Sequence, residues 1–186
     1  MKTFSKVKKC KKFVPIFLSA GKNDFPSLDV ALISIKDNIS KKRAYAVYIL
    51  HDGAEECLQQ TIARLADKKF KINFIDVSGY EDSAAAYRAI LPTLFPKLDK
   101  ALYFNSNVVA LSDVAELYSA SFGNAYLMDV KEPTIAHTPK LLDYNVSRKP
   151  WHYTDVPYQD YFWKYAVQSA FYEEFLSRLK GFAKAN

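Results

Sequence analysis

Short apolar runs alternate with amphipathic stretches along most of the chain. An apolar run of roughly four to eight residues between turn residues is typical of a strand that is covered on both faces. Strands are expected at Phe13–Leu18, Tyr45–Leu50, Lys71–Val77, Lys100–Phe104 and Asn124–Val130, with a short extended piece at Val108–Leu111. Strands that alternate with helices form parallel, covered sheets, so this pattern predicts an α/β fold.

Apolar residues recur at helical spacing between and after these strands. Helices are expected from Asn23 or Asp24 to Ile35, from Asp52 to Leu65, at Ala84–Leu91, from Asp113 to Leu117, at Gln159–Gln168 and at Phe171–Ala183. Asp52 and Glu55 have the spacing of a capping box at a helix start. Aromatic side chains of the C-terminal segment are expected to pack in the core, namely Tyr158, Tyr161, Phe162, Trp163 and Tyr165.

The character of the chain changes after Pro133. Residues 135–160 contain several prolines and little periodicity, which predicts a long ordered loop. The chain contains neither G-x-G-x-x-G nor G-x-x-x-x-G-K-[ST], so no motif supports a dinucleotide site or a P-loop. The expected organisation is a basic arm at residues 1–12 and one domain at residues 13–186, with an α/β core at 13–133 and a loop and helices at 134–186.

The formal charge of the chain, +6 at pH 7, comes from its first residues. Residues 1–12 contain six lysines and no acidic residue, and the rest of the chain has 20 basic and 20 acidic side chains. A neutral body lacks the basic surface of a nucleic-acid-binding domain, so no nucleic-acid partner is expected. A short lysine arm is usually solvated, or it can contact an anionic membrane surface.

The lysine arm and the apolar run after it imitate the start of a signal peptide. The run at Phe13–Leu18 is shorter than the ~7–15 residues of a signal-peptide core, and Pro15 interrupts it. No run approaches the ~20 apolar residues that a membrane span needs. Cys10 and Cys57 provide no disulfide framework and no zinc-site spacing, so a reducing, cytoplasmic location is expected.

The most informative motif follows the expected strand at Lys100–Phe104. The polar triplet Asn105-Ser106-Asn107 comes directly after it, and apolar Val108-Val109 come next. With the preceding Tyr87–Pro92, this segment resembles the family 8 glycosyltransferases, the family of glycogenin and of lipopolysaccharide galactosyltransferases. Members of that family have a helix ending in Y-R-x-x-L-P and then K-x-L-Y-L-D-S-D-V-I-V, in which D-S-D is the D-x-D metal motif.

Other stretches resemble the same family in the same order. They are Val14-Pro15-Ile16, the segment at residues 111–126, and Lys149-Pro150-Trp151 with the aromatic residues after it. The resemblance covers nearly the whole chain and depends on the number and order of the matches. It implies a GT-A-type fold, which is a Rossmann-like, mostly parallel sheet flanked by helices, here followed by C-terminal helices.

The resemblance also implies a reaction, which is retaining transfer of a sugar from a UDP-sugar to a glycan acceptor. Negative charge builds on the leaving diphosphate, and a divalent cation, Mn²⁺ or Mg²⁺, would neutralise it together with nearby Lys or Arg. By resemblance, the candidate diphosphate contacts are Arg88, Lys149 and Ser106. The residues at the candidate metal site are Asn105, Asn107 and His137.

This metal site departs from the family pattern at both carboxylates. Asn105 and Asn107 offer neutral amide oxygens where the family has Asp, which weakens binding of Mn²⁺ or Mg²⁺. In the first loop, Gly21 and Asp24 replace an Asp and a Tyr of the family. The section that contains acceptor contacts in the family is missing after Val130, and the surface it would cover can favour self-association.

Two functions are compatible with these features. In the first, the protein retains weak or metal-independent sugar transfer, with Arg88, Lys149 and Lys22 supplying positive charge in place of the cation. In the second, it is a non-catalytic remnant that binds a nucleotide, a glycan or a protein partner. The lost carboxylates and the missing section favour the second function.

Overall fold

A computed structural model of the chain describes residues 13–80, 84–121, 139–144 and 147–185. Its strands are β1 (Phe13–Ala20), β2 (Ala44–His51), β3 (Phe70–Asp76), β4 (Leu102–Asn105), β5 (Val108–Ala110) and β6 (Leu141–Asp143). Its helices are the short 3-10 helix η1 (Lys22–Asp24) and the α-helices α1 (Phe25–Asn38), α2 (Glu56–Ala63), α3 (Ala84–Leu94), α4 (Ala115–Ser119), α5 (Gln159–Ala166) and α6 (Tyr172–Ala185). None of these helices is both long and apolar enough to cross a membrane.

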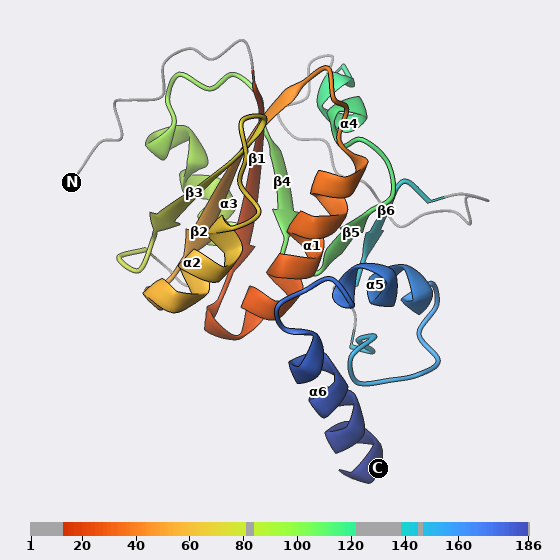
Figure 1. The fold of residues 1–186 in the computed structure, drawn as a ribbon. Helices are drawn as coiled ribbons and strands as arrows, with labels where there is room; N and C mark the ends of the chain where they lie inside the picture. The colour runs from red at the N-terminus through yellow and green to blue at the C-terminus, as the bar shows by residue number, and fades with distance from the viewer. Residues whose placement is uncertain (1–12, 81–83, 122–138, 145–146, 186) are drawn as a thin grey trace.

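Four parallel strands form the main sheet in the order β3-β2-β1-β4 (Figure 1). β1 pairs with β2 along its whole length and with β4 over Ile16–Ser19, and β2 pairs with β3. β5 and β6 form a separate antiparallel pair. Because the strands of the main sheet are parallel, all of their carboxyl ends lie at one edge. The predicted α/β class, with a mostly parallel sheet and C-terminal helices, is confirmed.

Helix α1 lies between the main sheet and the C-terminal helices, and it is buried on nearly all sides. One side of α1, which includes Leu28 and Leu32, packs in the same cluster as the sheet. The opposite side, which includes Val30 and Ile33, packs in a cluster with aromatic residues of the C-terminal segment. A helix that is apolar all round is typical of an internal layer. α1 therefore joins the sheet to residues 151–175.

Helix α3 and the residues after it cover the other face of the sheet. Phe17 of β1 and Tyr48 of β2 stack with their ring centroids 4.9 Å apart. Phe95, which directly follows α3, meets both rings edge-on. Tyr87 of α3 is buried in the same cluster. The sheet is therefore covered on both faces, as the apolar runs predict.

An aromatic centre holds the C-terminal segment together. The ring of Phe162 lies 5.1 Å from the ring of Trp151 and 5.1 Å from that of Phe175, measured between centroids. The prediction that all the aromatic residues here pack in the core is wrong for two of them, because Tyr158 is 46% exposed and Tyr161 is 38% exposed. Both lie at the start of α5.

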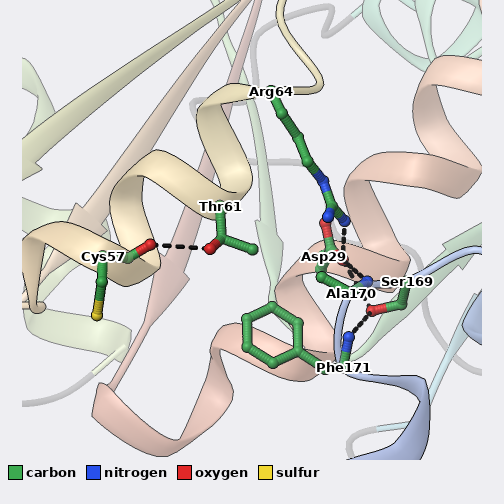
Figure 2. A network of polar contacts seen from close by, with 7 residues as sticks. All are labelled: Asp29, Cys57, Thr61, Arg64, Ser169, Ala170 and Phe171. Carbon is green, nitrogen blue, oxygen red and sulfur yellow. Dashed lines mark hydrogen bonds and ion pairs between the residues drawn. The ribbon is translucent and has the colours of Figure 1, made fainter.

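A buried carboxylate ties α1 to the end of α2 and to the turn between α5 and α6 (Figure 2). Asp29 is fully buried, and its Oδ2 accepts hydrogen bonds from Arg64 Nη2 at 2.8 Å and from Ser169 Oγ at 2.8 Å. The backbone N–H of Ala170 donates to the same oxygen at 3.0 Å. Burial raises the pKa of Asp29, and these donors partly oppose that effect.

The predicted capping box of Asp52 and Glu55 is wrong. The N-cap of α2 is Glu55, and its side chain makes no capping hydrogen bond. Before it, the chain turns through Gly53 at a φ of 73°, and the N–H of Ala54 is already bonded to His51 Nδ1 at 3.0 Å. This turn moves the helix start past the position where Asp52 could cap it.

Two other element boundaries differ from the predictions. The region 135–160 was expected to be a loop, but it contains β6, whose pairing with β5 depends on residues distant in the sequence. The third helix was expected to end near Pro92, but it continues to Leu94. A proline in the last turn removes only one N–H donor there, so the turn can still form. The expected strand at Asn124–Val130 and the arm at 1–12 lie outside the described residues.

Candidate functional site

The polar triplet lies at the carboxyl edge of the main sheet. Asn105 ends β4 and pairs with Ser19 near the end of β1. Ser106 is buried, and the triplet leads directly from β4 into β5. Parallel α/β sheets bind ligands beyond the carboxyl ends of their strands, so the triplet lies where such a site is expected.

Asn107 presents a buried oxygen that nothing nearby satisfies. Its Oδ1 has no hydrogen-bond partner among the residues that the structure describes. Its backbone carbonyl oxygen accepts the N–H of Tyr144 at 2.9 Å. An unpaired buried acceptor costs about 1–3 kcal/mol, so the amide of Asn107 would gain from a donor or a cation supplied by a ligand.

β6 brings an acidic residue next to the triplet. In the antiparallel pair, Asp143 lies opposite Val108, directly beside Asn107. Asp143 was not predictable as a site residue, because this contact depends on β5 and β6 pairing across more than thirty residues. The only sequence signal was the apolar pair before it, which is too short to predict a strand.

Lys149 lies at the same edge. Its Nζ donates to the backbone oxygen of Tyr144 at 2.6 Å and lies 5.8 Å from the ring centroid of Trp151. Burial lowers the pKa of Lys149, and the carboxylates of Asp143 and Asp24 partly offset that effect. The lysine is therefore close to the loop after β1 as well as to β6.

The loop after β1 is held by a backbone contact. Asp24, at the end of η1, accepts the N–H of Gly21 at 3.1 Å with its Oδ2. This bond closes the turn between β1 and α1. The fold thus brings together Asp24, Asn107, Asp143 and Lys149 from four separate segments of the chain.

A second polar group lies at the ends of β2 and β3. His51 is 4% exposed and lies opposite Asp76. Since His51 Nδ1 accepts the N–H of Ala54, the neutral ring has its proton on Nε2. Burial lowers the pKa of His51, and Asp76 and Asp52 partly offset this. The sequence analysis assigned Asp52 to a helix cap and missed this group.

Arg88 is not joined to the lysine by any contact of the described residues. It is exposed on α3, and its charge partly lowers the burial-raised pKa of Tyr103 of β4. No hydrogen bond or ion pair given for the described residues joins Arg88 to Lys149 or to the triplet. His137 lies outside the described residues.

The donor set at this edge does not fit a tightly held divalent cation. Within the described ranges, no group of three or more His, Cys, Asp and Glu side chains could hold a metal ion. The oxygen donors near the triplet are the neutral amides of Asn105 and Asn107 and the carboxylate of Asp143. The carboxylate of Asp24 already accepts the N–H of Gly21, and the ammonium of Lys149 lies beside these groups. Mn²⁺ and Mg²⁺ sites require more anionic oxygen than this, and a neighbouring ammonium opposes a cation.

Comparisons with known proteins agree with this fold. A family model described as Glycosyl transferase family 8 matches residues 15–140. The apo structure of the bifunctional glycosyltransferase WbbM aligns with 90% of this chain and 52% of its own, at a TM-score of 0.78 and 14% identity. The glycosyltransferase GlyE of Streptococcus pneumoniae TIGR4 aligns with 94% of this chain and 64% of its own, at a TM-score of 0.66 and 13% identity.

At these identities the likeness shows the fold alone, and the expected GT-A-type arrangement is confirmed. The chain spans 52% of the WbbM structure and 64% of the GlyE structure. In a search of curated proteins, no match was found.

Proposed function

The chain belongs to glycosyl transferase family 8, and we propose on this basis that it binds a nucleotide-sugar, a UDP-sugar, at the carboxyl edge of its main sheet. The observation that supports this proposal most is the position of Lys149. Its ammonium lies at the edge where parallel sheets bind ligands, and the same residue precedes Pro150-Trp151 in the stretch that resembles the family.

We further propose that Lys149 contacts the diphosphate. A half-buried ammonium attracts an anionic group more strongly than an exposed one, because less water screens it. The backbone oxygen of Tyr144 fixes the direction of Nζ. Ser106 and Arg88 remain proposed contacts to the same group, and Asn105, Asn107 and His137 remain the proposed relic of a metal site.

Sugar transfer by this chain is proposed to be weakened or lost. Charge that develops on the leaving diphosphate needs fixed positive charge in the transition state. With amides in place of two carboxylates, little of that charge can come from a held cation, so Lys149 must supply most of it. If transfer persists, it is expected to be retaining and to use a glycan acceptor.

A second candidate function is that of a non-catalytic protein that binds a nucleotide, a glycan or a protein partner. One observation favours it, namely the neutral triplet Asn105-Ser106-Asn107 where the family has two carboxylates. Contact of residues 1–12 with an anionic membrane, self-association and a cytoplasmic location stay predictions.

Calorimetric titration of UDP, with and without Mn²⁺, tests the donor site. We expect UDP to bind with the same affinity in both conditions. Lys149→Gln should weaken binding about tenfold, because it removes a charged hydrogen-bond donor to the diphosphate.

The matched control is Lys140→Gln, because Lys140 is an exposed lysine paired with Glu116. This variant should bind UDP like the wild type. Failure of the wild type to bind UDP in either condition would refute the donor site, and equal effects of the two lysine variants would refute the role of Lys149.

A further inference from the structure

Two exposed tyrosines lie next to each other at the start of α5. Tyr158 is 46% exposed and Tyr161 is 38% exposed, and their ring centroids are 6.4 Å apart with an angle of 36° between the planes. Among the described residues, Tyr80 and Val167 are the other large apolar side chains with this much exposure. The pair thus forms a small, tilted aromatic surface in contact with solvent.

The backbone of Tyr158 is strained. Its φ of 60° and ψ of 18° lie in the left-handed region, and it is the one non-glycine residue with positive φ among those the structure describes. This conformation is unfavourable for a residue with a Cβ, whereas glycine adopts it readily. Residues held in such conformations by the surrounding structure cluster at active sites and ligand sites.

One residue links this surface to the proposed donor site. The hydroxyl of Tyr144 donates to the backbone oxygen of Tyr158 at 2.6 Å, and the backbone oxygen of Tyr144 accepts from Lys149 at 2.6 Å. Tyr161 and Asp160 are also close enough to Tyr144 to raise the pKa of its hydroxyl further, after burial. Tyr144 therefore links the tyrosine pair to Lys149, since it bonds Tyr158 through its hydroxyl and Lys149 through its backbone oxygen.

We propose that Tyr158 and Tyr161 form the surface on which the pyranose rings of a glycan acceptor stack. This inference rests on the proposed function, because transfer needs the acceptor hydroxyl near the diphosphate. A pyranose has an apolar C–H face and a rim of hydroxyls, and a tyrosine has an apolar ring and a polar tip that match them. A surface of two such rings suits neutral sugars better than it suits an ionic ligand.

Substitutions at Tyr158 separate binding from stability. Tyr158→Gly relieves the backbone strain, so its thermal midpoint should rise, while its glycan affinity should fall about tenfold. Tyr161→Ala should lower glycan affinity by a similar factor. Tyr158→Phe and Tyr161→Phe retain the rings and should stay within about twofold of the wild type.

The experiment measures binding of each variant to an array of oligosaccharides ending in glucose, galactose or N-acetylhexosamine, with UDP titration in parallel. Tyr80→Ala, which removes another exposed tyrosine, is the control and should leave binding unchanged. The inference is refuted if the wild type binds UDP but no glycan on the array, or if Tyr158→Gly and Tyr161→Ala bind glycans as the wild type does. Tyrosine-dependent glycan binding without UDP binding would support the inference and contradict the proposed donor site.

Discussion

The side-chain oxygens of Asn105 and Asn107 differ from those of aspartate in charge far more than in shape. Asn107 Oδ1 is already buried and unpaired within the described residues, beside Asp143. Two added carboxylates would join Asp143 and give this edge the anionic oxygen that a hard divalent cation prefers.

We expect Asn105→Asp with Asn107→Asp to bind Mn²⁺ at least about tenfold more tightly than the wild type, as measured by calorimetry. The control is Gln60→Glu with Gln168→Glu, which adds the same charge at exposed positions on α2 and after α5. If the triplet variant and this control bind Mn²⁺ equally, the triplet is not a relic of a metal site.

Side chains next to a strong local pattern are predictable from the sequence, and those placed by tertiary contacts are not. The triplet follows the apolar run of β4 and lies at the carboxyl edge of the sheet. Lys149 is identified only because Lys149-Pro150-Trp151 resembles the family, and the structure places it near Tyr144. Asp143 reaches that edge only through the pairing of β5 with β6. The exposure of Tyr158 depends on a left-handed backbone that its sequence neighbours do not predict.

Helix α1 is held by contacts with segments that are distant in the sequence. Its buried Asp29 receives hydrogen bonds from Arg64, Ser169 and Ala170, and so joins three parts of the chain (Figure 2). Removing the carboxylate would leave buried donors on α5–α6 without an acceptor.

We expect Asp29→Ala to lower the free energy of unfolding by about 3 kcal/mol in urea denaturation, because it breaks a buried, hydrogen-bonded charge pair. Arg64→Gln should cost about 1 kcal/mol or less, since Arg64 is 42% exposed, Ser169 and Ala170 still donate to Asp29, and the glutamine amide can donate as well. Hydrogen exchange should also speed up in α6 of the Asp29 variant. If Asp29→Ala lowers the free energy of unfolding by less than about 0.5 kcal/mol, Asp29 does not stabilise the contact of α1 with the C-terminal segment.

The sequence predicts most of the longer helices and strands. It does not predict where some of them begin and end, or the short strand β6. β1, β2 and α1 follow continuous apolar runs that are long enough to be recognised in the sequence. β6 has three residues and exists because β5 pairs with it. The start of α2 is determined by the turn at Gly53, which competes with the capping pattern of Asp52.

For the whole molecule, two histidines whose pKa the fold lowers make stability depend on pH near neutrality. Burial lowers the pKa of His51, and burial together with Arg178 and Lys149 lowers the pKa of His152. The unfolded chain therefore binds more protons than the folded chain below a pH of about 6.5, the ordinary pKa of histidine. The free energy of unfolding must then fall as the pH falls through that value.

We expect His51→Asn to reduce this fall, measured by urea denaturation between about pH 8 and about pH 5. Asparagine retains an acceptor for the N–H of Ala54 but does not titrate. Adding His152→Asn should flatten the profile further. If the free energy of unfolding falls equally with pH in the wild type and in His51→Asn, the pKa of His51 is the same in the folded and unfolded chains.

The tie between Asp29 and Ser169 joins residues that are 140 positions apart. At a synthesis rate of roughly 5–20 residues per second, the ribosome makes Ser169 on the order of ten seconds after Asp29. During that interval α1 lacks the aromatic layer on one side, and its carboxylate lacks two of its three donors. The nascent chain therefore exposes one apolar side of α1 until residues 151–175 have been made, and this is the stage at which a chaperone would bind it.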